Sequence, residues 1–205
     1  MRIAGVVLPL ALAIAAGSAI ASPPTAQIVE DGTTLDVVYW PTPAAVVDAM
    51  IDVADVKPTD LVYDLGCGDG RIVVAAAKRG ARGIGFDLNP KRVREARRNA
   101  ERNRVQQLVE IRRADIFKVD FRQADVVFMY LLPEVITDLK PALARLKPGA
   151  RIVSHEFGMR GAKADRIVRV AAPADKSPLD KRRRETETHK ILLWRLPWKE
   201  QIEAT

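Results

Sequence analysis

The chain has 205 residues, of which 48% are hydrophobic and 29% charged, and its 33 basic and 26 acidic side chains leave a formal net charge of +7. This length suits one globular domain, and the composition excludes collagen-like, repeat and disordered proteins. A single cysteine, Cys67, excludes an intrachain disulfide framework, while His155 and His189 lie far apart in the sequence and offer no zinc-ligand spacing. We therefore expect an organic cofactor or acidic groups to carry any chemistry, and no metal.

The amino-terminal segment has the pattern of an export signal or a membrane anchor. Residues 3–21 carry no charge and end in Ala19-Ile20-Ala21, a small-x-small pattern typical of signal-peptide cleavage. The stretch also approaches the length of a membrane span, although Pro9 weakens it as a permanent helix. We expect residues 1–21 to be cleaved or to remain as an anchor. The positive-inside rule then places the domain outside the cytoplasm, in the cell envelope.

Residues 22–38 form a polar lead-in, and the domain begins at residue 39. Thr42 and Pro43 suit the N-cap and first position of a helix whose apolar residues recur up to Ala54. A short apolar strand over residues 61–65 then stops at a glycine-rich turn. A helix over residues 72–79 follows and ends at Gly80. The first unit of the domain is therefore strand, tight turn and helix.

The same alternation continues along the chain. A strand over residues 82–88 is followed by Asn89-Pro90, which suits a helix start, and Val93, Ala96 and Ala100 mark the buried face of that helix. We expect further strands over residues 109–113, 124–132 and 151–157, with a helix over residues 135–146. Residues 167–170 and 188–196 suit a terminal antiparallel pair. The pattern predicts an α/β fold, a Rossmann-like doubly wound sheet that is mostly parallel, with helices on both faces.

Acidic residues end or follow successive strands of this predicted sheet. They are Asp64, Asp87 and Asp115, and the glycines of the first turn are Gly66, Gly68 and Gly70. Ligands of such sheets bind at the carboxyl ends of the strands, where glycine lets a ligand approach the backbone and a carboxylate can accept ribose hydroxyls. The spacing disfavours NAD, because the dinucleotide fingerprint needs a small residue where Arg71 or Val73 stands. No Gly-Lys-Ser/Thr follows the turn, so the P-loop pattern also fails.

These residues resemble the first motif of class I S-adenosylmethionine-dependent methyltransferases, acid-x-G-x-G-x-G, with acids after the second and third strands. The resemblance covers residues 39–196 and includes the final antiparallel strand of that fold. It implies S-adenosyl-L-methionine as cofactor, with Asp64 among the residues that bind it and the turn from Gly66 to Gly70 on its methionine part. Asp87 would then bind the ribose, and Asp115 with Ile116 the adenine. Tyr130, at the end of the fourth strand, would lie near the transferred methyl group.

Short segments resemble a narrower group. Residues 39–43, 64–73 and 127–133 look like bacterial relatives of the membrane-associated protein-lysine N-methyltransferases that act on mitochondrial carriers such as the adenine nucleotide translocase and on the c ring protein of ATP synthase. The resemblance implies an enzyme and a protein substrate with an acceptor lysine. Two alternatives stay open: N- or O-methylation of a small molecule, and a noncatalytic module that binds an adenosyl ligand or RNA.

A lysine acceptor must lose a proton before it can attack the methyl group. Tyr130 is the favoured residue for orienting the amine, with Glu134, His155 and Glu156 as further candidates. Tyr130 could instead only fill the cofactor pocket, and His155 could be a hydrogen-bonded residue at a strand end.

Basic clusters point to a second kind of contact. They comprise residues 91–104, Arg112-Arg113 and residues 181–184, and they could face phosphates, acidic lipid headgroups or an acidic protein surface, or only solvent.

Base methylation is disfavoured, because residues 127–133 lack the Asp/Asn-Pro-Pro-aromatic pattern and Cys67 lies inside the glycine turn. An exported domain would also be separated from the cytosolic supply of S-adenosylmethionine, so the predicted location and the predicted cofactor are in tension.

Overall fold

The computed structural model describes residues 27–28, 34–35, 39–173 and 186–200. The predicted signal or anchor over residues 1–21 and the basic cluster at 181–184 lie outside these ranges, as does most of the predicted lead-in. Among the helices within the ranges, none combines the length and the apolar character that a membrane crossing requires.

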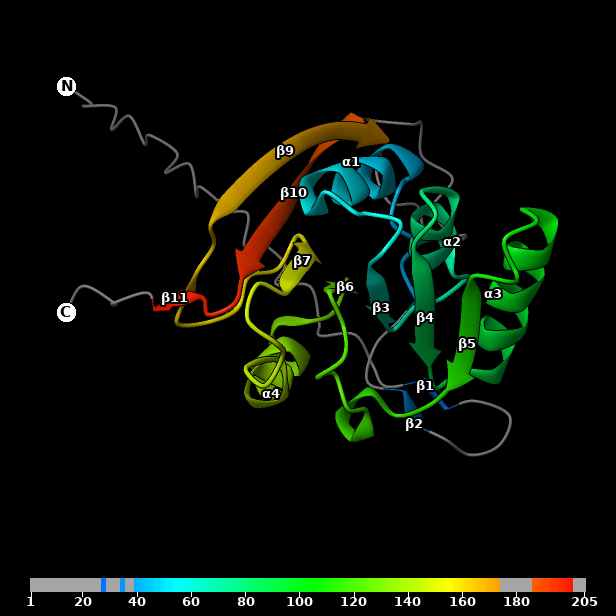
Figure 1. Cartoon of the computed structure of the whole chain (residues 1–205), viewed down its shortest axis with the longest axis horizontal. Helices are drawn as coiled ribbons and strands as arrows, with labels where there is room; N and C mark the ends of the chain where they lie inside the picture. Colours follow the sequence, from blue (N-terminus) through cyan, green and yellow to red (C-terminus); the bar gives the residue numbers. More distant parts are fainter. Residues whose placement is uncertain (1–26, 29–33, 36–38, 174–185, 201–205) are drawn as a thin grey trace, which may run out of the picture.

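Seven strands form one central sheet in the order β5-β4-β3-β6-β7-β10-β9 (Figure 1). Their bounds are β3 Leu61–Leu65, β4 Arg82–Asp87, β5 Val109–Arg113, β6 Val126–Met129, β7 Arg151–His155, β9 Arg166–Pro173 and β10 Thr186–Arg195. The strands from β5 to β7 run parallel, whereas β10 pairs antiparallel with both β7 and β9. This topology confirms the predicted fold class and its terminal antiparallel pair.

Helices cover both faces of the sheet. Helices α1 (Ala44–Ala54), α2 (Arg71–Lys78) and α3 (Pro90–Arg102) pack against the strands on one face, with α2 in contact with both of the others, and α4 (Pro133–Leu143) packs on the other face. Shorter elements are the 3-10 helix η1 (Ile116–Lys118) and two small antiparallel ladders, β1 (Gln27–Ile28) with β2 (Thr34–Leu35) and β8 (Ala162–Lys163) with β11 (Lys199–Glu200). The ladders were not predicted, because two-residue strands leave no periodicity to detect.

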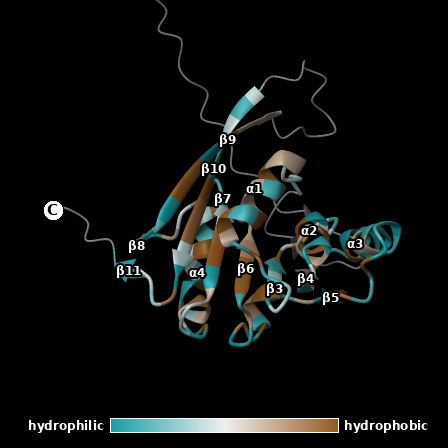
Figure 2. Ribbon diagram, turned by 45° about the horizontal axis from the view of Figure 1, so that its top comes forward, coloured by the Kyte–Doolittle hydropathy of each residue, from teal (hydrophilic) through white to brown (hydrophobic). Residues whose placement is uncertain are grey.

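The core follows from the alternation of side chains along the buried strands. In β6, Val126 and Phe128 pack in the cluster that contains α1, while Val127 and Met129 pack in the cluster that contains α4. Figure 2 shows hydrophobic colour concentrated on the central strands and hydrophilic colour over much of α3. A sheet buried on both faces is the arrangement expected for parallel strands.

A buried ion pair connects the start of β7 to the loop before β3. Arg151 Nη2 donates to Asp60 Oδ1 at 2.6 Å, and its Nη1 donates to the carbonyl oxygen of Ala54 at 2.8 Å. The second carboxylate oxygen of Asp60 accepts from the backbone N–H of Lys57 at 2.7 Å. These contacts hold the end of α1 against the sheet.

The structure corrects several predicted boundaries. Thr42 is not the N-cap of α1, because the helix begins at Ala44 with Pro43 as its N-cap, and the Thr42 hydroxyl lies 3.3 Å from His155 Nδ1 instead. Strands β6 and β7 are shorter than expected: α4 already begins at Pro133, and the chain turns at Glu156, which has a φ of +63°. The apolar residues after Met129 contribute to the core without pairing in the sheet.

Candidate active site

The glycine turn between β3 and α2 has a backbone that only glycine adopts readily. Gly66, Gly68 and Gly70 have φ values of +74°, +55° and +75°. A Cβ atom on Gly68 would lie 2.3 Å from Cε2 of Tyr39, and one on Gly70 would lie 2.8 Å from Cβ of Ala96. The turn therefore needs glycine both for its conformation and for its close contacts.

This turn opens onto a cleft at the carboxyl ends of the parallel strands. Strands β4 and β6 flank β3 on opposite sides, so chain order reverses at β3, the position where open α/β sheets bind ligands. The cleft is lined by residues from the turn, the strand ends, η1 and the segment before α1. They include Tyr39, Trp40, Thr42, Asp64, Gly66, Cys67, Asp69, Arg71, Asp87, Arg92, Asp115, Ile116, Phe117, Tyr130 and Val135. The structure thus brings the three predicted acids to one cleft.

Asp64 is a buried carboxyl group at the base of the cleft. Burial, with a further contribution from Asp87 and Asp69, raises the pKa of Asp64 to about 8. Within the part of the chain that the structure describes, Asp64 Oδ2 has no hydrogen-bond partner. A cationic group in the cleft would supply the missing partner and favour the ionised form.

Asp87 ends β4 and is held in place by backbone donors. Its Oδ2 accepts from the N–H of Gly68 at 2.9 Å, and its Oδ1 accepts from the N–H of Asn89 at 2.8 Å. Burial raises the pKa of this carboxyl group above its ordinary value. Each carboxylate oxygen can accept a further hydrogen bond, so Asp87 can still bind a pair of hydroxyl groups in the cleft.

Asp115 and Ile116 lie at the start of η1. Asp115 Oδ1 accepts from the backbone N–H of Phe117 at 3.0 Å, which caps this short helix. The cap positions η1 and the exposed ring of Phe117 at the cleft. Both predicted adenine contacts therefore lie at the cleft, and their contact with adenine remains a prediction.

Tyr130 follows β6 and lies between the cleft and a group of rings beside it. Its ring centroid is 4.1 Å from that of His155 and 6.2 Å from that of Phe157, which is nearly parallel to it. His155 itself is fully buried, and burial, with a smaller contribution from His189, lowers its pKa to about 3. The alternative reading of His155 as a hydrogen-bonded residue at a strand end agrees with this position.

The other candidates for the amine site lie elsewhere. Glu134, His155 and Glu156 are not among the described residues that line the cleft. Glu134 is exposed on α4, His155 contacts the cleft residues Tyr130 and Thr42 from behind, and Glu156 follows His155 in the chain. The two histidines are far apart in the sequence, but in the structure His155 Nε2 lies 3.0 Å from His189 Nδ1.

Several cleft residues were missed by reasoning from the sequence. Tyr39 packs on Gly68, and the guanidinium of Arg92 from α3 lies 4.3 Å from the centre of the Tyr39 ring. Arg71 pairs with Asp69 at 2.6 Å and donates to the carbonyl oxygen of Thr42 at 2.6 Å, which holds the segment before α1 against the turn. The run Tyr39-Trp40-Pro41-Thr42-Pro43 was a usable signal, because it is one of the segments that resemble the narrower methyltransferase group.

The residues present fit S-adenosylmethionine. Gly66 and Cys67 of the turn line the cleft, Asp87 has acceptor capacity for two ribose hydroxyls, and Asp64 has a buried oxygen, unpartnered among the described residues, that suits a cation. The cleft also offers Ile116 and Phe117 as apolar surfaces for a base. Cys67 is no candidate nucleophile, since burial raises the pKa of its thiol well above the ordinary value.

Comparisons with known proteins agree with this geometry. The model of the ANTKMT methyltransferase domain family matches residues 64–166. The chain is 46% identical over 135 residues to a protein-lysine N-methyltransferase of Saccharolobus islandicus, covering 64% of this chain and 84% of the relative. It is 39% identical over 125 residues to the adenine nucleotide translocase lysine N-methyltransferase of Mus musculus, covering 60% of this chain but only 54% of that relative.

A solved structure is similar over most of the domain. It is described as an RNA methyltransferase from Salinibacter ruber in complex with S-adenosyl-L-homocysteine, and it shares 41% sequence identity with this chain at a TM-score of 0.66. The match covers 80% of this chain and 97% of that one. The bound product of methyl transfer in that structure agrees with the cofactor that the cleft fits here.

Proposed function

The chain belongs to the ANTKMT methyltransferase domain family, and from this premise we propose that its acceptor is the ε-amine of a lysine in a protein. The chain is an enzyme that uses S-adenosylmethionine as methyl donor. The observation that carries the acceptor proposal is its 46% identity to a protein-lysine N-methyltransferase across 84% of that relative.

Different residues of the cleft would bind different parts of the methyl donor. When bound, S-adenosylmethionine supplies an electrophilic methyl group on a sulfonium. Asp87 and the glycine turn would hold its ribose and methionine parts, and the carboxylate of Asp64 would face a cationic group. No covalent enzyme intermediate is needed, so the main task of the protein is to align the amine and exclude water.

The acceptor side of the cleft has features that suit a lysine in a peptide segment. Tyr130 lines the cleft, and its hydroxyl can orient an amine that has lost its proton. Trp40, which is 42% exposed, lies at the same cleft and offers apolar surface to the residues that flank a lysine. An apolar approach also favours the neutral amine over the ammonium form.

The acceptor proposal can be tested with the radiolabelled methyl donor. The full chain is incubated with protein and RNA fractions of its source cell in separate reactions, and labelled protein is hydrolysed for amino-acid analysis. We expect label in methyl-lysine, and none in the protein fraction with Asp87→Ala. The matched control Asp138→Ala, which removes an exposed carboxylate on α4, should behave like wild type. Label confined to the RNA reaction, or none in either reaction despite measured cofactor binding, would contradict the proposal.

Trp40→Ala provides a second, independent readout. If Trp40 contacts the acceptor segment, this variant raises KM for the protein substrate by about tenfold while the affinity for S-adenosylmethionine stays within a factor of two, since loss of a buried aromatic contact costs on the order of 1–2 kcal/mol. If KM for the protein substrate and the dissociation constant for S-adenosylmethionine rose equally, Trp40 would be assigned to the cofactor instead.

RNA is the second candidate acceptor. The similar Salinibacter structure is described as an RNA methyltransferase, and α3 presents exposed basic residues, namely Lys91, Arg94, Arg97, Arg98 and Arg102. The missing Asp/Asn-Pro-Pro-aromatic pattern at the end of β6 speaks against methylation of an exocyclic base amine. Label that nuclease treatment removes would favour this candidate over a lysine.

We also propose that residues 1–21 direct the chain to a membrane, as a cleaved signal or as an anchor, with the basic face of α3 as a contact for anionic lipids. The support is the uncharged run and its small-x-small end. Mass spectrometry of the mature amino terminus, combined with cell fractionation, tests this location and the tension with a cytosolic methyl donor. A complete amino terminus in the soluble fraction would refute it.

A further inference from the structure

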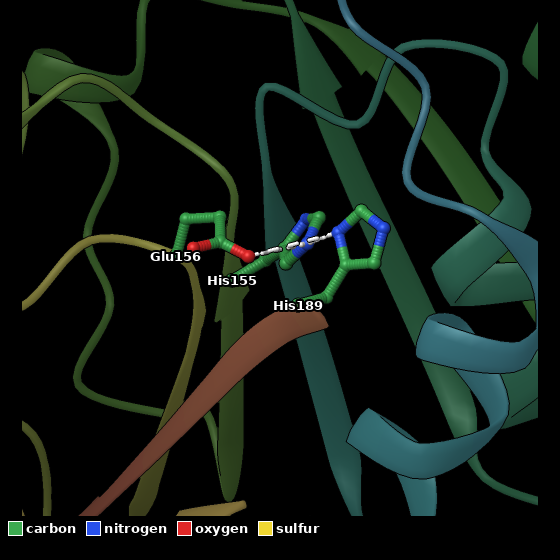
Figure 3. A group of neighbouring side chains, drawn as sticks. All are labelled: His155, Glu156 and His189. Atoms are coloured by element: carbon green, nitrogen blue, oxygen red, sulfur yellow. Dashed lines mark hydrogen bonds and ion pairs between the residues drawn. The ribbon is translucent and has the colours of Figure 1, made fainter. Parts of the chain in front are cut away.

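The chain contains only two histidines, and the fold brings them together beside one carboxylate (Figure 3). His155 is the last residue of β7, Glu156 follows it, and His189 lies on the antiparallel strand β10. His155 and His189 are 0% and 4% exposed, and Glu156 is partly exposed. Burying polar side chains costs free energy unless they have partners, so a cluster of them at one point calls for a partner that they share.

The three donor atoms have the spacing of ligands around one metal ion. His155 Nε2 lies 3.0 Å from His189 Nδ1, and Glu156 Oε1 lies 3.7 Å from the first and 3.6 Å from the second. Ligands about 2.1 Å from a tetrahedral zinc ion are separated by roughly 3.4 Å, so the observed distances bracket that value. Figure 3 shows the three side chains converging, His155 from the end of β7, Glu156 from the residue after it and His189 from β10.

The surroundings hold these side chains in orientations that suit a metal. His155 Nδ1 lies 3.3 Å from the Thr42 hydroxyl, so a proton on Nδ1 leaves the Nε2 lone pair directed at the other two donors. Glu156 Oε1 accepts from the backbone N–H of Lys190 at 2.8 Å, which fixes the carboxylate against β10. The left-handed backbone of Glu156, with φ at +63°, turns the chain so that adjacent residues can reach the same point.

We propose that His155, Glu156 and His189 form a binding site for a divalent transition metal ion, with zinc as the best match. Two imidazoles and one carboxylate favour zinc, cobalt or nickel over magnesium or calcium, which prefer oxygen ligands alone. Three protein ligands leave a further coordination position for water. The site joins β7 to β10 and lies beside two residues of the cleft, because His155 contacts both Tyr130 and Thr42. A bound ion would therefore stiffen the acceptor wall of the cleft.

The composition of the chain makes this site easy to test. Because no other histidine exists in the chain and its one cysteine is buried, few competing sites for such an ion are available. The untagged full chain, stripped of metal with a chelator, is titrated with Zn²⁺ by calorimetry and with Co²⁺ by visible absorption. We expect one equivalent of each ion to bind and the cobalt spectrum to show imidazole coordination.

Variants identify the ligands. Replacement of hydrogen-bond partners around metal ligands already costs 10- to 100-fold in affinity, so we expect His189→Gln and Glu156→Gln to lose at least about 100-fold. The matched control Glu134→Gln, an exposed glutamate on α4, should bind like wild type. Affinity unchanged in both ligand variants would overturn the proposal, as would the absence of any binding to wild type.

A measurement on the unmodified chain covers the case in which a variant does not fold. The ring nitrogens of both histidines are followed by NMR during the zinc titration. We expect both rings to shift together at one equivalent, and no shift would mean that they share only a hydrogen bond. None of these readouts needs the methyl donor or an acceptor, so their failure would leave the proposed function untouched.

Discussion

Replacing Asp87 by alanine should remove the main polar contact with the ribose of the cofactor. In the structure both carboxylate oxygens accept backbone hydrogen bonds, at 2.9 Å from Gly68 and 2.8 Å from Asn89, and both remain able to accept a further bond. A hydrogen bond to a charged group contributes about 1.5–3 kcal/mol, and about 1.4 kcal/mol corresponds to a tenfold change in affinity. We therefore expect Asp87→Ala to weaken binding of S-adenosylmethionine by about 100-fold.

The same substitution leaves two backbone donors without their acceptor, which should lower the free energy of unfolding by about 1–3 kcal/mol. Binding is measured by isothermal titration with S-adenosylmethionine and S-adenosylhomocysteine, at a temperature where circular dichroism shows the variant folded. Asp87→Asn, which keeps one acceptor oxygen, should fall between wild type and Asp87→Ala, and Asp138→Ala serves as the unaffected control. Wild-type affinity in a folded Asp87→Ala protein would refute the ribose contact.

Three further outcomes follow from other features of the domain. Gly68→Ala should lower stability by at least about 1–2 kcal/mol, because its φ of +55° is left-handed and its Cβ would meet Tyr39; an unchanged urea midpoint would contradict this. The pKa of Asp64 is about 8 in the folded state and about 3.9 in the unfolded state, so between these pH values the folded state binds one proton more. The stabilisation from that proton is present at pH 4 and is lost as the pH rises toward 8. Without cofactor, the free energy of unfolding of wild type should therefore fall relative to that of Asp64→Asn between pH 5 and pH 8. If urea titrations give the two proteins parallel curves of this free energy against pH, the raised pKa of Asp64 is refuted. Arg151→Met should lower the free energy of unfolding by about 3–5 kcal/mol, because it leaves the buried carboxylate of Asp60 without its ion-pair partner. Adding Asp60→Asn to this variant should restore part of that stability. If urea titrations show that the losses of the two single variants simply add, the two residues are not coupled.

Elements with local signals were predicted well from the sequence. In α3, Asn89 caps the helix by accepting from the N–H of Lys91, and Val93, Ala96 and Ala100 are its buried residues, as the helical spacing indicated. The convergence of Asp64, Asp87 and Asp115 was also predictable, because the carboxyl ends of parallel strands meet at one edge of the sheet. Their contacts with the cofactor remain predictions.

Contacts set by distant pairing were not predictable. His189 reaches His155 because β10 returns antiparallel beside β7, with Ile191 opposite His155, and nothing near either histidine in the sequence specifies that register. The stacking of Arg92 on Tyr39 likewise joins α3 to a segment without regular structure. The end of β6 was placed too late, since the apolar residues after Met129 pack in the core outside the sheet and give the same hydrophobic pattern as a strand.

The contact of Tyr39 with Gly68 bears on where this domain can be divided. The family match begins at residue 64, yet Tyr39, Trp40 and Thr42 form part of the cleft from outside it. A fragment trimmed to the matched region would keep the glycine turn but lose the aromatic ring that covers it, along with β10. Any attempt to transplant or shorten this fold should therefore carry the residues ahead of α1 as an inseparable piece of the binding wall.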